Sequence, residues 1–280
     1  MLVNDVNTTN TLISSGDLNF SAAGGFRVGA GFCLCNGWTL EAQFLGGLNH
    51  VATSRVTGVN NLALPGDLGL SVNNFFLADE VDVRYESNLN SPEINFVCCC
   101  CCCDNSCCGS GVCDSCEYFV GLRYIDFSEE LAIRSNDLQE GISTYRVRTY
   151  NNLYGGQIGL RRRRCWGRWS LEGTGKAGIY ANDASQVQDP IYDFPNIQYR
   201  SRREAEDTVA AFAGELNLSG IYHINDIWGI RGGYNLLWIE GVALAPDQLD
   251  FTDTALSGTT IDTNGSVFFH GASIGLEARY

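Results

Sequence analysis

The sequence predicts an all-β protein, an antiparallel up-and-down transmembrane β-barrel, from three observations. Apolar residues alternate with polar or small ones in nine stretches, a period typical of strands with two unlike faces. Aromatic residues stand near both ends of several apolar faces, as in the girdles of outer-membrane barrels. Long and short connections alternate in phase, which is expected when long loops lie on one rim and short turns on the other.

The predicted strands are taken in chain order. They lie at about 24–33, 38–44, 81–97, 118–124, 150–160, 169–179, 212–222, 228–238 and 265–280. Long loops are predicted at about 46–77, 128–144, 182–207 and 243–264, and short links after the first, fifth and seventh strands. An odd number of strands is unusual in bacterial single-chain barrels. Nine strands are visible, and we expect ten in the intact protein.

The same pattern of strands and loops predicts the division of the chain. Residues 1–23, rich in Asn, Thr and Ser, are predicted to form a loop segment before the first visible strand. Residues 24–280 are predicted to form the barrel, with a Cys-rich periplasmic turn at 98–116. The start MLVNDVNTTNT has neither a basic nor an apolar region typical of a signal peptide. Since a barrel must be exported, we expect a signal peptide to precede this sequence. The odd strand count, together with the missing signal peptide, predicts one further N-terminal strand before it.

The spacing of aromatic residues matches the thickness of a bilayer. Phe212 and Tyr222, like Trp228 and Trp238, are ten positions apart, which is about 25 Å of tilted strand. The predicted aromatic girdle comprises Trp38, Trp169, Phe212, Tyr222, Trp228, Trp238, Phe268 and Tyr280. These positions indicate outer-membrane lipid as a partner.

The other strand faces collect charges that are nearly balanced in sign. The predicted lumen-facing residues are Arg27, Glu41, Asp82, Arg84, Glu86, Arg123, Arg161, Glu172, Lys176, Glu215, Arg231, Glu277 and Arg279. They could line a pore or form an ion-pair network that fills a narrow barrel, which the balance and the small strand number favour. The run 161–164, four arginines, is predicted to be a solvated rim.

Cysteines are the most unusual feature of the composition, with 13 in the chain. Those predicted as possible disulfide partners on the short-turn rim are Cys33, Cys35, Cys98, Cys99, Cys100, Cys101, Cys102, Cys103, Cys107, Cys108, Cys113 and Cys116. Disulfides suit the oxidising periplasm. Metal capture by Cys113-x-x-Cys116 is a second interpretation, although one such spacing is a weak signal and no metal site is assigned. A permissive low-complexity turn is the third, and an odd thiol could link neighbouring barrels.

Other function classes are disfavoured by composition. A net charge of −14 argues against nucleic acid as a partner. No nucleophile, base and orienting group can be assembled from the sequence, so we expect no enzyme activity and no cofactor. No apolar stretch is long enough for a transmembrane helix.

Three segments carry a family resemblance. VGLRYIDFSEELAI, YNNLYGGQIGLRRRRCWGRWSLEGTGKAGI and GYNLLWIEGVALAPDQLD, with the terminal IGLEARY, resemble the β-barrel porin family abundant in planctomycete-type bacteria, over about residues 24–280. The resemblance implies an outer-membrane location, passage of small polar solutes, and recognition of the aromatic last residue by the outer-membrane assembly machinery. The alternative function is a structural or surface-display barrel with a plugged lumen and no conductance.

Overall fold

A computed structural model of the chain describes residues 2–7, 10–18, 20–34, 37–99, 112–139, 141–193 and 195–278, with the backbone alone at 99 and 112–114. The strands are β1 (Val3–Asp5), β2 (Thr11–Ile13), β3 (Phe26–Cys33), β4 (Trp38–Ala63), β5 (Ala78–Cys99), β6 (Val112–Asp137), β7 (Gly141–Trp166), β8 (Trp169–Gln188), β9 (Ile191–Asp193), β10 (Ile197–Arg200), β11 (Arg203–His223), β12 (Trp228–Val242) and β13 (Gly265–Ala278). The short helical turns are η1 (Ser15–Asp17), α1 (Leu68–Ser71), η2 (Asn73–Phe75) and η3 (Ala245–Gln248).

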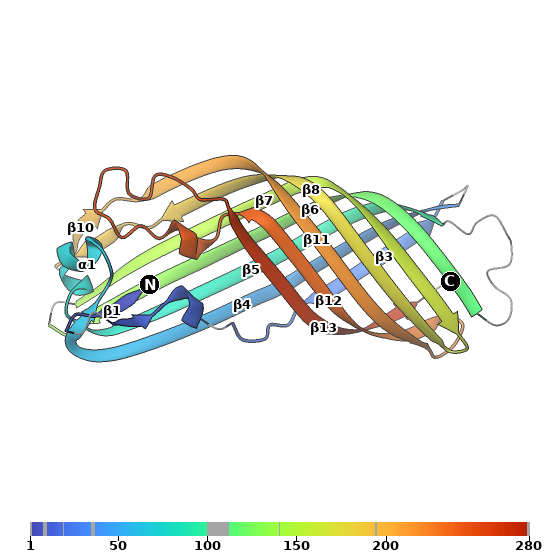
Figure 1. Cartoon of the computed structure of the whole chain (residues 1–280), viewed down its shortest axis with the longest axis horizontal. Coiled ribbons are helices and arrows are strands. Elements are labelled where there is room, and N and C mark those ends of the chain that lie inside the picture. Colours follow the sequence, from blue (N-terminus) through green and yellow to red (C-terminus); the bar gives the residue numbers. More distant parts are fainter. Residues whose placement is uncertain are drawn as a thin grey trace.

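The nine long strands form one strongly curled antiparallel sheet (Figure 1). Its order is β13-β12-β11-β8-β7-β6-β5-β4, and both β3 and the short pair β1–β2 extend it from β4. Strands β9 and β10 form a separate hairpin within the connection from β8 to β11. The all-β class and the antiparallel up-and-down order are therefore confirmed, and each of the nine predicted strands corresponds to one of these long strands. The sheet also contains β1 and β2, and in the described residues it is not closed into the predicted barrel.

The curled sheet is open along one seam. Among the described residues, β3 and β13 are edge strands that do not pair with each other. Because strand direction alternates across the sheet, the two edges run in the same direction, so they cannot pair antiparallel. Farther along the seam, Phe20 packs its ring 4.8 Å from Tyr85 and 5.9 Å from His50, and His50 lies 5.6 Å from Phe269. The segment before β3 thus contacts the inner side of the sheet beside the seam.

Several predicted loops are strands. The predicted loops at 46–77, 128–144 and 182–207 are largely occupied by the extensions of β4, β6, β7, β8 and β11. Strands β6 and β7 have 26 residues each and meet at a tight turn around residue 139. These predictions were wrong because alternation continues through the segments with the opposite polarity, apolar side chains inside and polar ones outside.

Two regions can be defined from this polarity, and we call them the stem and the head. The stem contains β3, β12, β13 and the ends of the other long strands near the short turns: 38–45, 91–99, 112–124, 153–166, 169–180 and 211–223. The head contains the opposite ends of those strands together with residues 2–18, 64–77, 189–202 and 243–264. Figure 1 shows the head at the end that carries α1 and β10, with the turns of the stem at the other end.

Strand β6 illustrates the change from stem to head. Its outward residues Val120 and Leu122 are exposed and apolar in the stem, while its inward Arg123 is buried. In the head the inward Leu131 and Ile133 are fully buried. The register with β7 runs without a shift from Val112–Trp166 to Asp137–Gly141, so the same backbone alternation serves both regions.

Strand β4 changes its phase at a bulge. Its register with β5 shifts between Leu45 and Leu48, and Gly47 has a φ of +71°, a conformation that favours glycine at bulges. The extra residue moves the inward set from odd positions such as Glu41 to even positions such as Ala52, which is buried.

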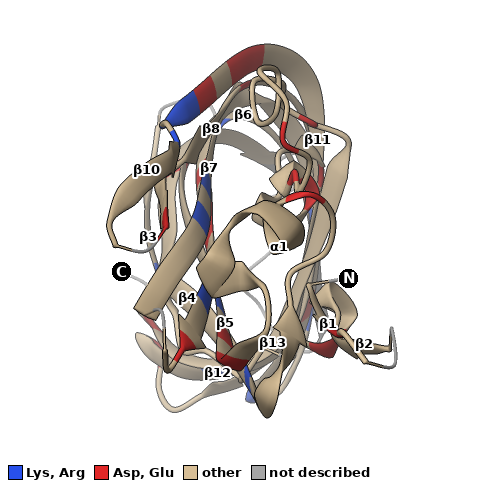
Figure 2. Ribbon diagram, turned by 90° about the vertical axis from the view of Figure 1, so that its left-hand side faces the viewer, with Lys and Arg blue, Asp and Glu red and all other residues tan. Residues whose placement is uncertain are grey.

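The head is filled by an apolar core. Leu68 of α1, Val72 between α1 and η2, and Phe75 of η2 are fully buried against β5, β6 and β7. Seen from the end of the molecule, α1 lies within the outline of the curled sheet (Figure 2). Loop 243–264 also turns inward, since Ala243 and Ala245 are fully buried.

Residues 1–23 are not simply a loop. Strand β1 pairs with the far end of β4 through Asn4 and Ala63, and β2 pairs with β1. Leu2, Val3 and Ile13 are buried in the core of the head. The Asn- and Thr-rich composition led to the loop prediction, but these few apolar residues order the segment by packing into the core of the head. No helix in the described part of the chain has the length and apolarity needed to cross a membrane.

Candidate functional site: the charged interior of the stem

A central layer of charged side chains crosses the stem. Glu215 on β11 accepts a hydrogen bond from Arg123 Nη1 on β6 at 2.8 Å and pairs with Arg27 on β3 at 2.7 Å. Lys176 on β8 pairs with Glu93 on β5 and lies 3.7 Å from Glu215. Apart from Arg27, these side chains are at most 5% exposed, so their charges depend on one another for compensation.

A second layer lies nearer the short turns. Arg161 on β7 binds Glu41 on β4 with both terminal nitrogens, at 2.8 and 2.7 Å. Arg231 on β12 bridges Glu172 on β8 and Glu277 on β13, at 2.7 and 2.6 Å. Planar guanidinium groups suit such paired contacts with carboxylates.

The layers leave little free volume at the centre. A void of about 10 Å³ lies among the central side chains, lined in part by Arg27, Glu93 and Glu215, which is at the lower limit for one water molecule. A larger cavity of about 520 Å³ lies at the short-turn end, where Cys165, His223 and Asp226 line it. The arrangement can hold the strands together and block an aqueous path at the central layer.

The structure brings together nine of the thirteen residues predicted to face the lumen. They are Arg27, Glu41, Arg123, Arg161, Glu172, Lys176, Glu215, Arg231 and Glu277. Arg279 lies outside the described residues. Asp82, Arg84 and Glu86 lie on the outer face of the head, where Arg84 pairs with Glu86 and Asp82 with Arg55.

That placement corrects the prediction for β5. Val81, Val83 and Tyr85, which alternate with these charges along β5, are buried in the head core. The physical reason is that this part of β5 covers an apolar core and turns its polar face outward, as a sheet with one solvated face does.

Sequence reasoning also missed three inward charges. Glu93 and Glu117 lie on the inner faces of β5 and β6, and Arg163 hydrogen-bonds Glu172 and Glu277 from β7. Arg163, predicted to be part of a solvated rim, has a side chain only 16% exposed. The signal was alternation through the arginine run, which directs 161 and 163 inward. With these three, the described ion-pair layers contain six basic and six acidic side chains.

Outward aromatic side chains form two rows on the stem. Trp169 packs its ring 4.9 Å from Tyr222 near the short turns, and Phe212 packs 5.7 Å from Trp238 near the head. Among the predicted girdle residues, those with large exposure are Trp38, Trp169, Trp228, Trp238 and Phe268. Tyr280 lies outside the described residues.

Four cysteines with described side chains lie at the short-turn end of the sheet. Cys33, Cys98, Cys116 and Cys165 are unbonded and range from intermediate to exposed. At Cys99 and Cys113 the backbone alone is described. Cys35, Cys100 to Cys103, Cys107 and Cys108 lie outside the described residues.

Glu129 on β6 carries a buried carboxyl group in the head. Tyr85 Oη donates a hydrogen bond to it at 2.7 Å, and the backbone N–H of Ala245 donates another at 2.9 Å. Burial raises the pKa of Glu129 to about 7, and the nearby Asp247 carboxylate adds to the rise while the two hydrogen bonds oppose it. Glu129 thus connects β6 to the inward loop 243–264.

A comparison with protein families identifies one match. Residues 3–187 match the family described as "Putative beta barrel porin-7 (BBP7)", which confirms the family resemblance from the N-terminal segment to the end of β8. No curated protein and no solved structure matches the chain.

Proposed function

The chain belongs to this β-barrel porin family, and on that premise we propose that it is an outer-membrane barrel with a closed lumen that anchors and displays the head. The family is one of porins and not of enzymes. The observation that carries the proposal is the central ion-pair layer, in which Glu215 is compensated by Arg27, Arg123 and Lys176.

The outer face of the stem supports a membrane location. From Trp169 to Ile179 on β8 the outward positions are apolar or glycine, a stretch of about 33 Å along the strand and about 25 Å when tilted. That height matches the apolar band of outer-membrane barrels. The head carries Arg84 and other outward charges, which are costly in lipid, so the stem alone would be embedded.

The interior of the stem supports a closed lumen. Ion pairs reach from β3 to β11 and from β5 to β8 across the space enclosed by the sheet. Wide aqueous channels require about 16 to 18 strands, whereas barrels of about this size are filled by side chains. Removing a buried partner leaves an uncompensated charge, which is strongly destabilising. The main role of the layers would therefore be to stabilise the fold.

A second candidate is the passage of small polar solutes, which the family description favours. In this case the central layer would act as a selectivity region and would have to rearrange to open. Partners expected under both candidates are outer-membrane lipid and the assembly machinery.

The deciding experiment measures conductance. Full-length protein refolded in mild detergent should change its gel mobility on boiling, as folded barrels do, and should give no current steps in planar bilayers. The double variant Arg123→Ala/Glu215→Ala tests whether the central layer blocks the path, and Arg84→Ala/Glu86→Ala on the head is the matched control. Discrete steps from the wild-type protein across lipids and voltages would favour the porin instead. A protein that is soluble and monomeric without detergent would refute both candidates.

A further inference from the structure

The register of β6 and β7 places two cysteines opposite each other, and we propose that Cys113 and Cys165 form a disulfide that ties these strands at the short-turn end. Cys113 is the direct register partner of Cys165. The ladder that sets this pairing runs without a shift from Val112–Trp166 to Asp137–Gly141. A slip by one residue would turn every inward side chain outward, so the long head and stem contacts of both strands fix the pairing at the cysteines.

Backbone geometry at such a pair suits a disulfide. Directly opposed residues in an antiparallel ladder have Cα atoms about 4.5 to 5.5 Å apart. Disulfides require about 4.4 to 6.8 Å. Opposed residues also share one face of the sheet, and positions 113 and 165 belong to the inner set that includes Arg123 on β6 and Arg161 on β7.

The other cysteines on described strands have different register partners. Cys33 lies opposite Thr39, Cys98 opposite Trp38 and Tyr118, and Cys99 opposite Glu117. Cys116 lies opposite Arg162. Within the described strands, therefore, the pair of Cys113 and Cys165 is the one in which the ladder sets two cysteines face to face.

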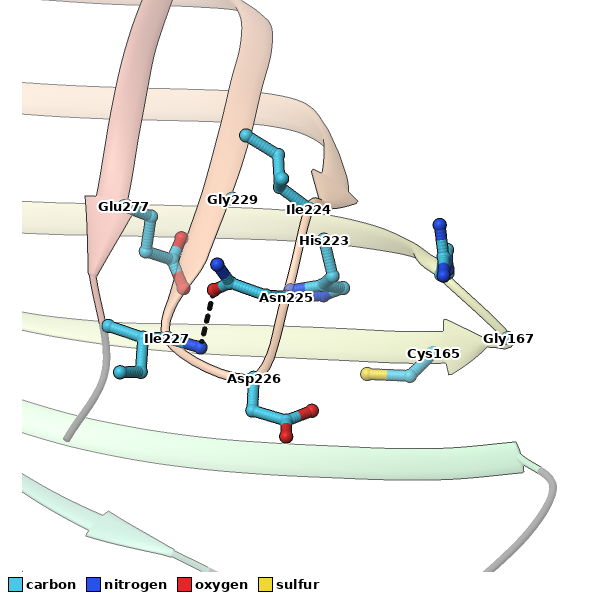
Figure 3. Close-up of a pocket in the computed structure, with 10 residues that line it drawn as sticks. Cys165, Gly167, His223, Ile224, Asn225, Asp226, Ile227, Gly229 and Glu277 are labelled. Carbon is cyan, nitrogen blue, oxygen red and sulfur yellow. Dashed lines mark hydrogen bonds between the residues drawn. The ribbon is translucent and has the colours of Figure 1, made fainter.

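Cys165 lies in a polar setting with access to a cavity. Ser170 Oγ donates a hydrogen bond to Cys165 Sγ at 3.2 Å and lies 2.7 Å from His223 Nε2. Figure 3 shows Cys165 and His223 together on the wall of the cavity of about 520 Å³, which gives a small oxidant access to the sulfur.

The chemistry is two successive thiol–disulfide exchanges with a small disulfide such as oxidised glutathione. The Cys165 thiolate attacks the donor disulfide and releases one donor thiolate. The Cys113 thiolate then attacks the Cys165 sulfur of the mixed disulfide and releases the second. The two protein thiols lose two electrons and two protons, and the donor is reduced to two thiols.

Peptide mapping can identify the bond directly. The protein is refolded in detergent with a glutathione redox mixture, free thiols are alkylated, and the unreduced chain is cut by trypsin and an Asp-specific protease. Cleavage yields the fragments 165–168 and 104–113. In the variant Cys107→Ser/Cys108→Ser, Cys113 is the single cysteine of its fragment, so a linked 104–113/165–168 species defines the bond.

The controls separate the native bond from random pairing. The linked species should persist in Cys116→Ser, disappear in Cys165→Ser and on reduction, and exceed by at least tenfold its amount in protein oxidised in urea. Electron-transfer fragmentation of the wild-type linked species gives the same assignment if the double variant fails to fold. Alkylation of Cys165 without reduction, or its linkage to a fragment other than 104–113, overturns the proposal. The refolding is done in vitro, so this outcome is independent of the membrane location and of conductance.

Discussion

The stem and the head are built from the same strands but have opposite polarity. On β6, the stem turns Leu122 outward and buries Arg123, whereas the head turns Arg134 outward and buries Ile133. The ladder between β6 and β7 has no shift that could exchange the faces. Side-chain chemistry alone therefore distinguishes the two regions, and each face matches the medium expected around it.

The two interiors are also stabilised in different ways. The head buries Phe75, Leu131 and Tyr145 in an apolar core, as a water-soluble protein does. The stem buries compensated charges, whose separation would be costly. One continuous sheet can thus enclose an apolar core at one end and a layer of compensated charges at the other.

The largest expected effect comes from the stem interior. Glu215→Ala leaves Arg27, Arg123 and Lys176 without their shared carboxylate, and we expect the free energy of unfolding to fall by about 3 to 5 kcal/mol. Urea unfolding in detergent measures it. The matched change on the outer face of the head is Glu86→Ala, which disrupts a pair whose arginine is 55% exposed and should cost less than about 1 kcal/mol. Equal losses in the two variants would remove the distinction between the regions.

The second effect tests the outer faces. Leu122 on the stem is 69% exposed, and Leu122→Arg should cost about 2 to 4 kcal/mol because it puts a charge against lipid. Ala132→Arg, outward on the head part of the same strand, should change stability by about 0.5 kcal/mol or less. Refolding yield into lipid vesicles and unfolding in urea provide the measurements. Similar tolerance at both positions would argue that the stem is not embedded.

The third effect concerns the buried acid of the head. Since the pKa of Glu129 is raised to about 7 from 4.5, its contribution to stability is fully present below about pH 4.5. It is lost as the pH rises through about 7, because the folded head must then bury a carboxylate. The difference is on the order of 3 kcal/mol. Glu129→Gln should flatten this part of the stability–pH curve, and an unchanged curve would contradict the assignment.

The smallest effect compares aromatic pairs of the two regions. A double-mutant cycle of Trp169 and Tyr222, whose rings lie 4.9 Å apart on the stem surface, should give a coupling of about 0.5 to 1.5 kcal/mol. Tyr145 and Phe251, 5.8 Å apart in the head, provide the reference cycle. We expect the stem coupling to depend on whether lipid or detergent surrounds the protein, and the head coupling not to depend on it.

Strand identity and most of the central charges were predictable from sequence. A period of two is local, so β8 and its inward Glu172 and Lys176 follow directly from the pattern. The alternation within a strand does not specify which of its two faces points into the interior. Val81 and Asp82 alternate in the same way whether the strand lies in lipid or in water, so the prediction extended the polarity of the stem into the head and inverted β5.

The remaining predictions were wrong because they depend on tertiary packing between distant segments. The inward turn of 64–77 depends on Leu68, Val72 and Phe75 meeting the core formed by other strands, and nothing in a polar loop composition indicates that contact. The pairing of Glu93 with Lys176 spans β5 and β8. Such a partnership depends on sheet curl, which alternation along one strand does not specify.

The uninterrupted ladder between β6 and β7 constrains how the length of this protein can vary during evolution. An insertion or deletion of one residue in either strand would transfer every later side chain to the wrong face, carrying Ile133 outward on β6 or Tyr145 outward on β7. Removing two residues from each strand beside their tight turn would shorten the head and preserve both faces. Length variants of the hairpin are therefore expected to differ by even numbers per strand, unless a bulge such as that at Gly47 of β4 absorbs the odd residue.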